Sequence, residues 1–218
     1  MLQPACVLME QQTLSSTVGF RAVSQRITKG TLVHVVGPSG AGKDTLLAGA
    51  RWALAKDDRF VFPHRIITRE TDSGAEQHVP ITIDAFRDAE RLSAFFLSWR
   101  SHGLAYALPG TIAAHLERGL IVVVNVSRTV IPAAEARAEN VTILNVSASP
   151  AILAARLATR GREAAEAIRP RLERVVPIQA QRAEIIEIAN DGAVEAATAD
   201  FIAALQHLTA ARPGPAAR

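Results

Sequence analysis

Residues 37–45 read GPSGAGKDT, and this stretch decides the fold. It follows the β-branched run TLVHVVG at 31–37, and it opens KDTLLAGARWALA at 43–55, where apolar residues recur at helical spacing. A glycine-rich turn between a buried parallel strand and a helix is the setting of a phosphate-binding loop. Glycines let the backbone wrap closely around the anion, and successive N–H groups and the helix N-terminus then face it.

The residue after the loop's lysine departs from the usual pattern. Lys43 supplies a mobile charge to the β- and γ-phosphates of a nucleotide, and a Ser or Thr hydroxyl normally follows it to bind Mg²⁺. Here the position is Asp44, whose carboxylate is also a hard ligand and is favoured in the first turn of a helix. We expect a working loop that depends strongly on Mg²⁺. Asp44 is expected to bind the metal directly or to contact one of its ligands. In the alternative, Asp44 is only a helix-terminal charge, and Thr45 or water serves the metal.

Composition narrows the class of protein. The 218 residues suffice for one domain with a full hydrophobic core, and 49% hydrophobic with 21% charged residues is usual for a soluble globular protein. A net charge of +3 and an aromatic content of 5% argue against a nucleic-acid partner. No apolar run is long enough to cross a membrane. The one cysteine, Cys6, allows no disulfide within the chain, so we expect a cytoplasmic protein.

Strands and helices alternate along the rest of the chain. We predict strands at 31–37, 59–68 (interrupted near Pro63), 94–99, 120–126, 141–147 and 183–190, and helices at 43–55, 81–92, 109–119, 149–161 and about 192–209. The run at 120–126 is the most hydrophobic and is expected to be central. This pattern predicts an α/β fold with a mainly parallel central sheet flanked by helices. The domain should span 30–210, between a flexible N-terminal extension at 1–29 and a tail at 211–218.

Five motifs carry a resemblance to a known group. They are GPSGAGKDTLL, ITR at 67–69, FFLSWRSHGLAY at 95–106, ASPAILAARLATRGRE at 148–163 and EIAND at 187–191. In this order and spacing, residues 31–209 resemble the guanylate-kinase-like P-loop kinases. The resemblance implies a P-loop kinase with a small acceptor-binding insertion and an Arg-rich lid. It also implies that Asn190 flanks the adenine of ATP.

Departures from guanylate kinases narrow the resemblance further. The carboxylates that read guanine correspond here to Ser98 and Ser127, which cannot supply a charged acceptor for guanine N–H groups. Asp72 stands where an acceptor-site Arg is expected. With HRIITR, GAEQHV, HGLAY and VVVNVSR, the chain resembles the ribose 1,5-bisphosphate phosphokinase branch. That resemblance implies the reaction of ATP with ribose 1,5-bisphosphate to give ADP and 5-phosphoribosyl 1-diphosphate, in phosphonate breakdown. The alternatives are a GMP kinase and a catalytically silent module that binds a protein partner.

The chemistry requires charge neutralisation and positioning rather than a general base, because the acceptor is a phosphate oxygen that is already anionic. The expected partners are a small phosphorylated sugar, ATP and Mg²⁺, in a monomer or a homodimer. Expected to bind ATP are Gly37, Pro38, Ser39, Gly40, Ala41, Gly42, Lys43, Asp44, Thr45 and Asn190, with Asp44 at the metal. Expected to bind the acceptor are Arg69, Arg65, His78, Tyr106 and Arg128, and expected to be catalytic are Lys43 and the lid residues Arg160 and Arg171.

Overall fold

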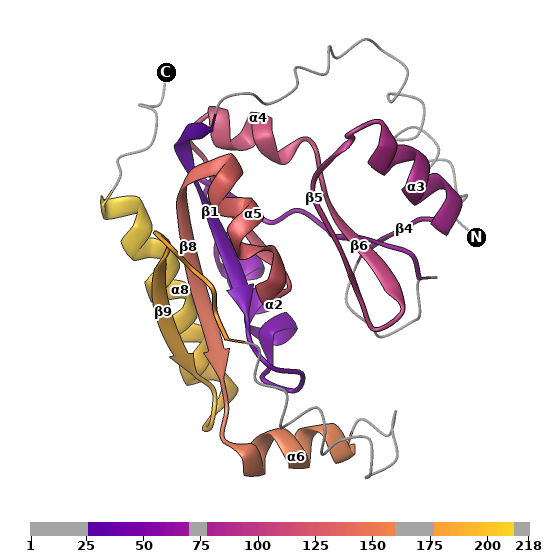
Figure 1. Cartoon of the computed structure of the whole chain (residues 1–218). Coiled ribbons are helices and arrows are strands. Elements are labelled where there is room, and N and C mark those ends of the chain that lie inside the picture. Colours follow the sequence, from indigo (N-terminus) through magenta and orange to yellow (C-terminus); the bar gives the residue numbers. More distant parts are fainter. Residues whose placement is uncertain (1–25, 70–77, 160–176, 212–218) are drawn as a thin grey trace, which may run out of the picture.

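The computed structural model describes residues 26–69, 78–159 and 177–211 (Figure 1). A five-stranded parallel sheet forms the body of the protein, in the order β2 (Phe60–Val61), β7 (Ile121–Asn125), β1 (Ile27–Val36), β8 (Ala138–Ser147) and β9 (Glu184–Ala189). From β1 the chain continues to β2 on one side, whereas β8 and β9 lie on the other side. The carboxyl end of β1 is therefore the point where strand order reverses, which is where open α/β sheets bind ligands.

Helices cover both faces of this sheet and bury two apolar clusters. On one face, α2 (Lys43–Ala53) and α8 (Val194–Ala211) pack through Leu46, Phe201 and Leu205. On the other face, α4 (Ile112–Glu117) and α5 (Ile131–Arg137) pack through Leu116 and Ile131. Because both faces are covered, β7 and residues 31–36 of β1 are buried at every position rather than at alternate positions.

A smaller four-stranded sheet stands beside the body (Figure 1). Its order is β4 (Val79–Pro80), β3 (Ile66–Ile67), β6 (Leu104–Pro109) and β5 (Phe95–Ser101), and α3 (Ile83–Arg91) packs on it. Phe86 of α3 lies with its ring centroid 4.8 Å from that of Phe95. The Thr82 hydroxyl accepts from Ala85 N and begins α3. This unit corresponds to the predicted insertion.

The fold class is confirmed, and several element predictions need correction. The run at 59–68 forms two short strands in different sheets, β2 and β3. The central strand is β1, with β7 next to it. The elements β4, β6 and α5 and the short 3-10 helix at Arg128–Val130 were not predicted. Strand β1 begins at Ile27, so residues 27–29 belong to the sheet. The rest of the predicted extension, residues 1–25, and the tail after Ala211 lie outside the described residues.

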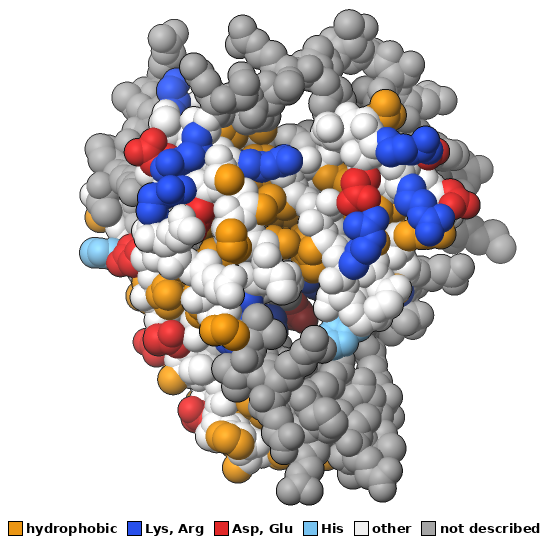
Figure 2. All heavy atoms as spheres, viewed as in Figure 1, with side chains coloured by type: hydrophobic (Ala, Val, Ile, Leu, Met, Phe, Trp, Pro, Cys, Tyr) orange, Lys and Arg blue, Asp and Glu red, His pale blue; other side chains and the backbone are white. Residues whose placement is uncertain are grey.

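Two further elements follow strands of the body: the 3-10 helix η2 (Arg128–Val130) comes after β7, and α6 (Pro150–Thr159) comes after β8. Within the described residues, no helix has the length and apolar character needed to span a bilayer. Figure 2 shows acidic and basic side chains interleaved on the face it displays. Over α3 they form ion pairs such as Arg87–Asp84 and Arg100–Glu90.

Candidate active site

The loop after β1 has three glycines with positive φ, and Gly37 and Gly42 show best why glycine is needed there. A β-carbon at Gly37, where φ is +150°, would lie 2.1 Å from the carbonyl oxygen of Val146. Gly42 has a φ of 92° and is the N-cap of α2, so no side chain covers the first N–H groups of that helix. These groups and the positive end of the helix therefore face the site, which is the arrangement that binds phosphate.

Lys43 lies inside this loop. Its Nζ donates to the carbonyl oxygens of Gly37 and Pro38, each at 2.9 Å. The ammonium is thus held over the loop, where a phosphate chain would need a positive charge. The loop and this lysine fit the triphosphate of a nucleotide.

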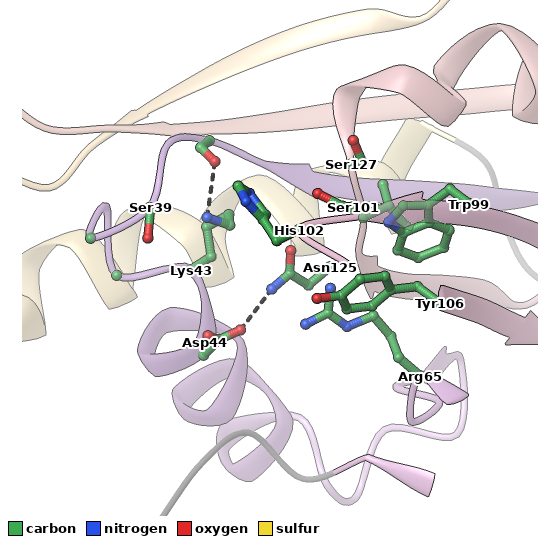
Figure 3. Close-up of a pocket in the computed structure, with 14 residues that line it drawn as sticks. Ser39, Lys43, Asp44, Arg65, Trp99, Ser101, His102, Tyr106, Asn125 and Ser127 are labelled. Atoms are coloured by element: carbon green, nitrogen blue, oxygen red, sulfur yellow. Dashed lines mark hydrogen bonds between the residues drawn. The ribbon is translucent and has the colours of Figure 1, made fainter. Parts of the chain in front are cut away.

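A pocket of about 270 Å³ lies between the loop and the smaller sheet (Figure 3). Described residues that line it are Gly37, Ser39, Gly40, Gly42, Lys43, Asp44, Arg65, Trp99, Ser101, His102, Tyr106, Asn125, Val126 and Ser127. They come from the loop after β1 and the start of α2, the segment before β3, the end of β7 and the residues that follow it, and the β5–β6 hairpin. The body therefore supplies the phosphate-binding side and the smaller sheet supplies the opposite side.

Asp44 lines this pocket, whereas Thr45 is not among the described residues that line it. Asn125 Nδ2 donates to Asp44 Oδ1 at 2.6 Å (Figure 3). The described residues contain no group of three or more His, Cys, Asp or Glu side chains placed to hold a metal. The oxygen atoms of Asp44 and Asn125 fit a hard cation such as Mg²⁺, provided that nucleotide phosphates complete its shell.

Two of the predicted acceptor residues lie on the hairpin side of the pocket. The Tyr106 ring stacks on Trp99, with centroids 5.4 Å apart and an interplanar angle of 8°. The guanidinium of Arg65 lies 5.5 Å from the centroid of Tyr106 on the same stack. This three-layer arrangement fixes the orientation of a phenol hydroxyl and a guanidinium, two groups that bind phosphate.

The other predicted acceptor residues lie elsewhere among the described residues. His78 is buried, and its Nε2 donates to the Arg69 carbonyl oxygen at 3.0 Å, so it holds backbone. Arg128 donates to Asn145 Oδ1 at 3.0 Å, and burial lowers its pKa, against the opposing effect of Glu187. The pocket lining contains none of Arg69, His78 and Arg128 within the described part of the chain.

The two serines that stand for guanine-reading carboxylates are placed differently. Ser127 lines the pocket and shares a 2.8 Å hydrogen bond with Thr129. Ser98 faces α3, where its hydroxyl donates to Glu90 Oε1 at 2.7 Å. The hydrogen bonds from Arg100 and then Ser98 lower the pKa of the Glu90 carboxyl. Ser98 is therefore occupied on the α3 side of the smaller sheet.

Asn190 lies beneath the phosphate loop rather than in the pocket lining. Its Nδ2 donates to the Ala41 carbonyl oxygen. Ala41 is itself fully buried, and Pro38 contributes its carbonyl to Lys43. Several residues predicted to bind the nucleotide thus shape the loop from within.

Several residues that sequence reasoning missed lie at the site, among them Asn125, Arg156 and His102. Arg156 on α6 points to the loop, where a β-carbon on Gly42 would lie 4.0 Å from its Nη1. That Nη1 is buried without a hydrogen-bond partner among the described residues. The sequence held one signal for this residue. Arg156 stands four residues before Arg160, and residues four apart lie on the same face of a helix. The predicted lid residues Arg160 and Arg171 lie outside the described residues.

His102 is another missed residue. It lines the pocket at the tip of the β5–β6 hairpin, and its φ is +50°. Together with Gly103, at φ +75°, it makes the tight turn that joins the two strands. A non-glycine residue in the left-handed region is strained and is often found at functional sites.

No protein-family model matches the chain. Similar proteins were found by comparison of sequences and of structures. A ribose 1,5-bisphosphate phosphokinase PhnN of Acidiphilium cryptum is 48% identical over 177 residues, covering 81% of this chain and 92% of that protein. One from Methylobacterium radiotolerans is 44% identical over 177 residues, covering 81% of this chain and 98% of that protein.

A longer relative and a solved structure complete the comparison. A bifunctional ribose 1,5-bisphosphokinase–thymidine phosphorylase of Roseobacter denitrificans is 42% identical over 184 residues, and the chain spans only 27% of its length. A guanylate kinase from Anaplasma phagocytophilum superposes with a TM-score of 0.57 at 14% identity, covering 83% of this chain and 86% of that one. This structural likeness shows the P-loop kinase fold alone. From the sequence identity and coverage, the chain belongs to the ribose 1,5-bisphosphate phosphokinase family.

Proposed function

We propose that this protein transfers the γ-phosphoryl group of ATP to ribose 1,5-bisphosphate and forms 5-phosphoribosyl 1-diphosphate. The observation that carries the proposal is the pocket between Lys43 and the Arg65–Tyr106 pair, with phosphate-binding groups on both sides. Two relatives that are 48% and 44% identical to this chain are named for this activity. A sugar with two phosphates needs such a two-sided arrangement of donors and positive charge.

The transfer is an in-line displacement. An oxygen of the acceptor's 1-phosphate forms a bond to the γ-phosphorus, and the bond from that phosphorus to the β–γ bridging oxygen breaks as ADP leaves. No base is required, because the attacking oxygen carries no proton that must be removed at neutral pH. The protein's task is to align the two phosphates and to neutralise their charges.

Each side of the pocket has a distinct role in this proposal. The N–H groups at the start of α2 and Lys43 bind the β- and γ-phosphates. Arg156 adds a second positive charge at the same end, close to Gly42. Arg65 and the Tyr106 hydroxyl orient the acceptor, and Arg160 and Arg171 remain proposed lid residues.

We further propose Mg²⁺ as the metal, held through Asp44 and the nucleotide. When bound, the cation neutralises charge on the phosphates during transfer. Asp44 supplies an anionic oxygen at the start of α2, and Asn125 fixes its orientation. We place the reaction in the cytoplasm, since ATP is the donor and Cys6 allows no disulfide within the chain.

A coupled ADP-release assay with Mg²⁺ and ATP tests the proposal, with ribose 1,5-bisphosphate, GMP and ribose 5-phosphate as separate acceptors. We expect turnover with the bisphosphate, and phosphorus NMR should show a new diphosphate on the sugar. Faster turnover with GMP would replace the proposal by the nucleotide kinase. ATP binding without turnover of any acceptor would favour the silent module.

A further inference from the structure

Asp44 and Asn125 form a contact between two elements far apart in the sequence. Asp44 lies in the first turn of α2, and Asn125 is the last residue of β7. In the sheet register Asn125 is the partner of Val35, one residue before the end of β1. The 2.6 Å hydrogen bond from Nδ2 to Oδ1 therefore joins the strand end beside the loop to the helix that follows the loop.

The identities of these two residues are the reverse of those expected in a phosphate-loop enzyme. The general arrangement holds Mg²⁺ with a hydroxyl after the loop's lysine and an Asp on a neighbouring strand. In this chain the carboxylate follows Lys43, and the neutral side chain is at the strand end. Both arrangements place one carboxylate and one neutral oxygen-bearing group at these two positions.

We propose that the carboxylate of the metal site stands after Lys43 instead of at the strand end, where the neutral Asn125 stands. We propose that Asn125 is a positioning residue that orients the Asp44 carboxylate to bind the metal. This inference rests on the proposed use of a metal–nucleotide complex. Asp44 is itself exposed, so its side chain needs a partner to hold one orientation. Asn125 is 6% exposed and fixed in the sheet, and its amide occupies Oδ1, which directs how the carboxylate faces the pocket.

Charge explains why one residue of the pair must be neutral. Two carboxylates at 2.6 Å would repel each other, and one of them would take up a proton. An amide at position 125 instead donates a hydrogen bond and leaves the charge of Asp44 intact. The described residues offer no metal cluster of their own, so we expect the cation to bind together with the nucleotide rather than before it.

The test is a reciprocal exchange read by metal affinity. Mn²⁺ replaces Mg²⁺ as the probe, and electron paramagnetic resonance measures free Mn²⁺ in the presence of ADP. The variants are D44S, N125A, N125D and the double variant D44S/N125D. We expect N125A to weaken Mn²⁺ binding by about 10–100-fold, as loss of an orienting partner typically does. D44S should weaken it at least as much, and N125D should weaken it through carboxylate repulsion.

The double variant decides the proposal, because it restores a hydroxyl on the loop and a carboxylate on the strand. It should bind Mn²⁺–ADP at least about tenfold more tightly than D44S, within the range of such partner effects. D44S/N145D is the matched control: Asn145 is the β1 neighbour on β8 and bonds Arg128 and Glu187 instead. It should show no recovery.

Two results would overturn the exchange: D44S/N125D binding no better than D44S, or N125A binding Mn²⁺–ADP like the parent protein. Melting temperatures measured without metal identify variants that fail to fold. If D44S fails to fold, D44N, which removes only the charge, replaces it in the single and the double variant. Because the readout uses ADP and no acceptor, it stands apart from the choice of sugar. A parent protein that binds Mn²⁺–ADP but does not phosphorylate ribose 1,5-bisphosphate would contradict the proposed function alone.

Discussion

Asn190 donates from Nδ2 to the carbonyl oxygen of Ala41 at 2.8 Å, directly beneath the phosphate loop. Its side chain is 1% exposed, and a β-carbon on Gly42 would lie 2.3 Å from the same nitrogen. The Asn190 amide therefore supports the loop from below, and its backbone N–H ties it to Ser147 of β8 at 2.8 Å. The shape of the loop thus depends on a residue at the far end of the chain.

Replacing Asn190 by Ala should loosen the loop. The Ala41 carbonyl would be left buried without its partner, which typically costs about 1–3 kcal/mol of folding stability. We also expect the KM for ATP to rise, because the N–H groups of the loop would no longer be held in place. Chemical denaturation and steady-state kinetics measure the two effects.

Asn140→Ala is the matched control for this change. Asn140 also donates to backbone carbonyls, those of Thr28 and Gly30, but it does so at the opposite end of β1. This variant should lose stability without a change in the KM for ATP. A rise in KM of the same size in both variants would show that Asn190 has no particular role in the loop.

Arg156→Met tests the second positive charge beside the loop. Loss of one charged hydrogen bond to a phosphate costs about 1.5–3 kcal/mol, so kcat/KM for ATP should fall roughly ten- to 150-fold. Arg87→Met on α3 is the control, because its exposed pair with Asp84 contributes little. Parent-like kinetics of Arg156→Met would place this side chain outside the reaction.

The sequence predicts the local parts of the site well, and the long-range parts poorly. The phosphate loop is a contiguous motif between a strand and a helix, so its glycines and Lys43 follow from spacing alone. The partner of Asp44 is 81 residues away and could not be read from spacing. Neither could the packing of Asn190 under a loop 149 residues earlier.

Strand register limited the prediction of the acceptor side. Ser98 and Trp99 are adjacent, yet they face opposite sides of the smaller sheet, because side chains alternate along a strand. An irregularity between Phe95 and Leu97 shifts the register there. The strand β6 was not recognised in the sequence, because Ala105 and Ala107 are small residues. Its pairing with β5 shows which side chains reach the pocket.

Tyr106→Phe should separate acceptor binding from ATP binding. The variant keeps the stack on Trp99 and loses only the hydroxyl. A hydrogen bond to a charged phosphate is worth about 1.5–3 kcal/mol, so kcat/KM for ribose 1,5-bisphosphate should fall about tenfold or more, with the KM for ATP unchanged. Arg65→Met should act in the same direction.

Arg100→Met is the matched control for the acceptor side. Arg100 belongs to the same sheet, but it faces α3, where it pairs with Glu90 at 2.7 Å. Its loss should leave both substrates' kinetic constants close to the parent values. Equal effects of Arg65→Met and Arg100→Met would mean that the smaller sheet acts through its folding and not through the pocket face.

His34 predicts a specific dependence of stability on pH. It is fully buried in β1, and neither ring nitrogen has a hydrogen-bond partner among the described residues. Burial lowers its pKa from 6.5 to about 3, against the opposing charge of Glu135. The folded protein therefore keeps His34 neutral, whereas the unfolded chain binds a proton below about pH 6.5.

The sign follows from that difference. Stability from this group is complete above pH 6.5 and declines as the pH falls toward 3, by up to about 1.4 kcal/mol per pH unit. His34→Leu removes the titration, so its free energy of unfolding relative to the parent should increase steadily between about pH 6.5 and about pH 4. Urea denaturation across this range measures the difference in free energy of unfolding. The contributions of the carboxylates, which both proteins share, cancel in this difference. A constant offset between the free energies of unfolding of His34→Leu and the parent protein at every pH would disprove the buried neutral imidazole.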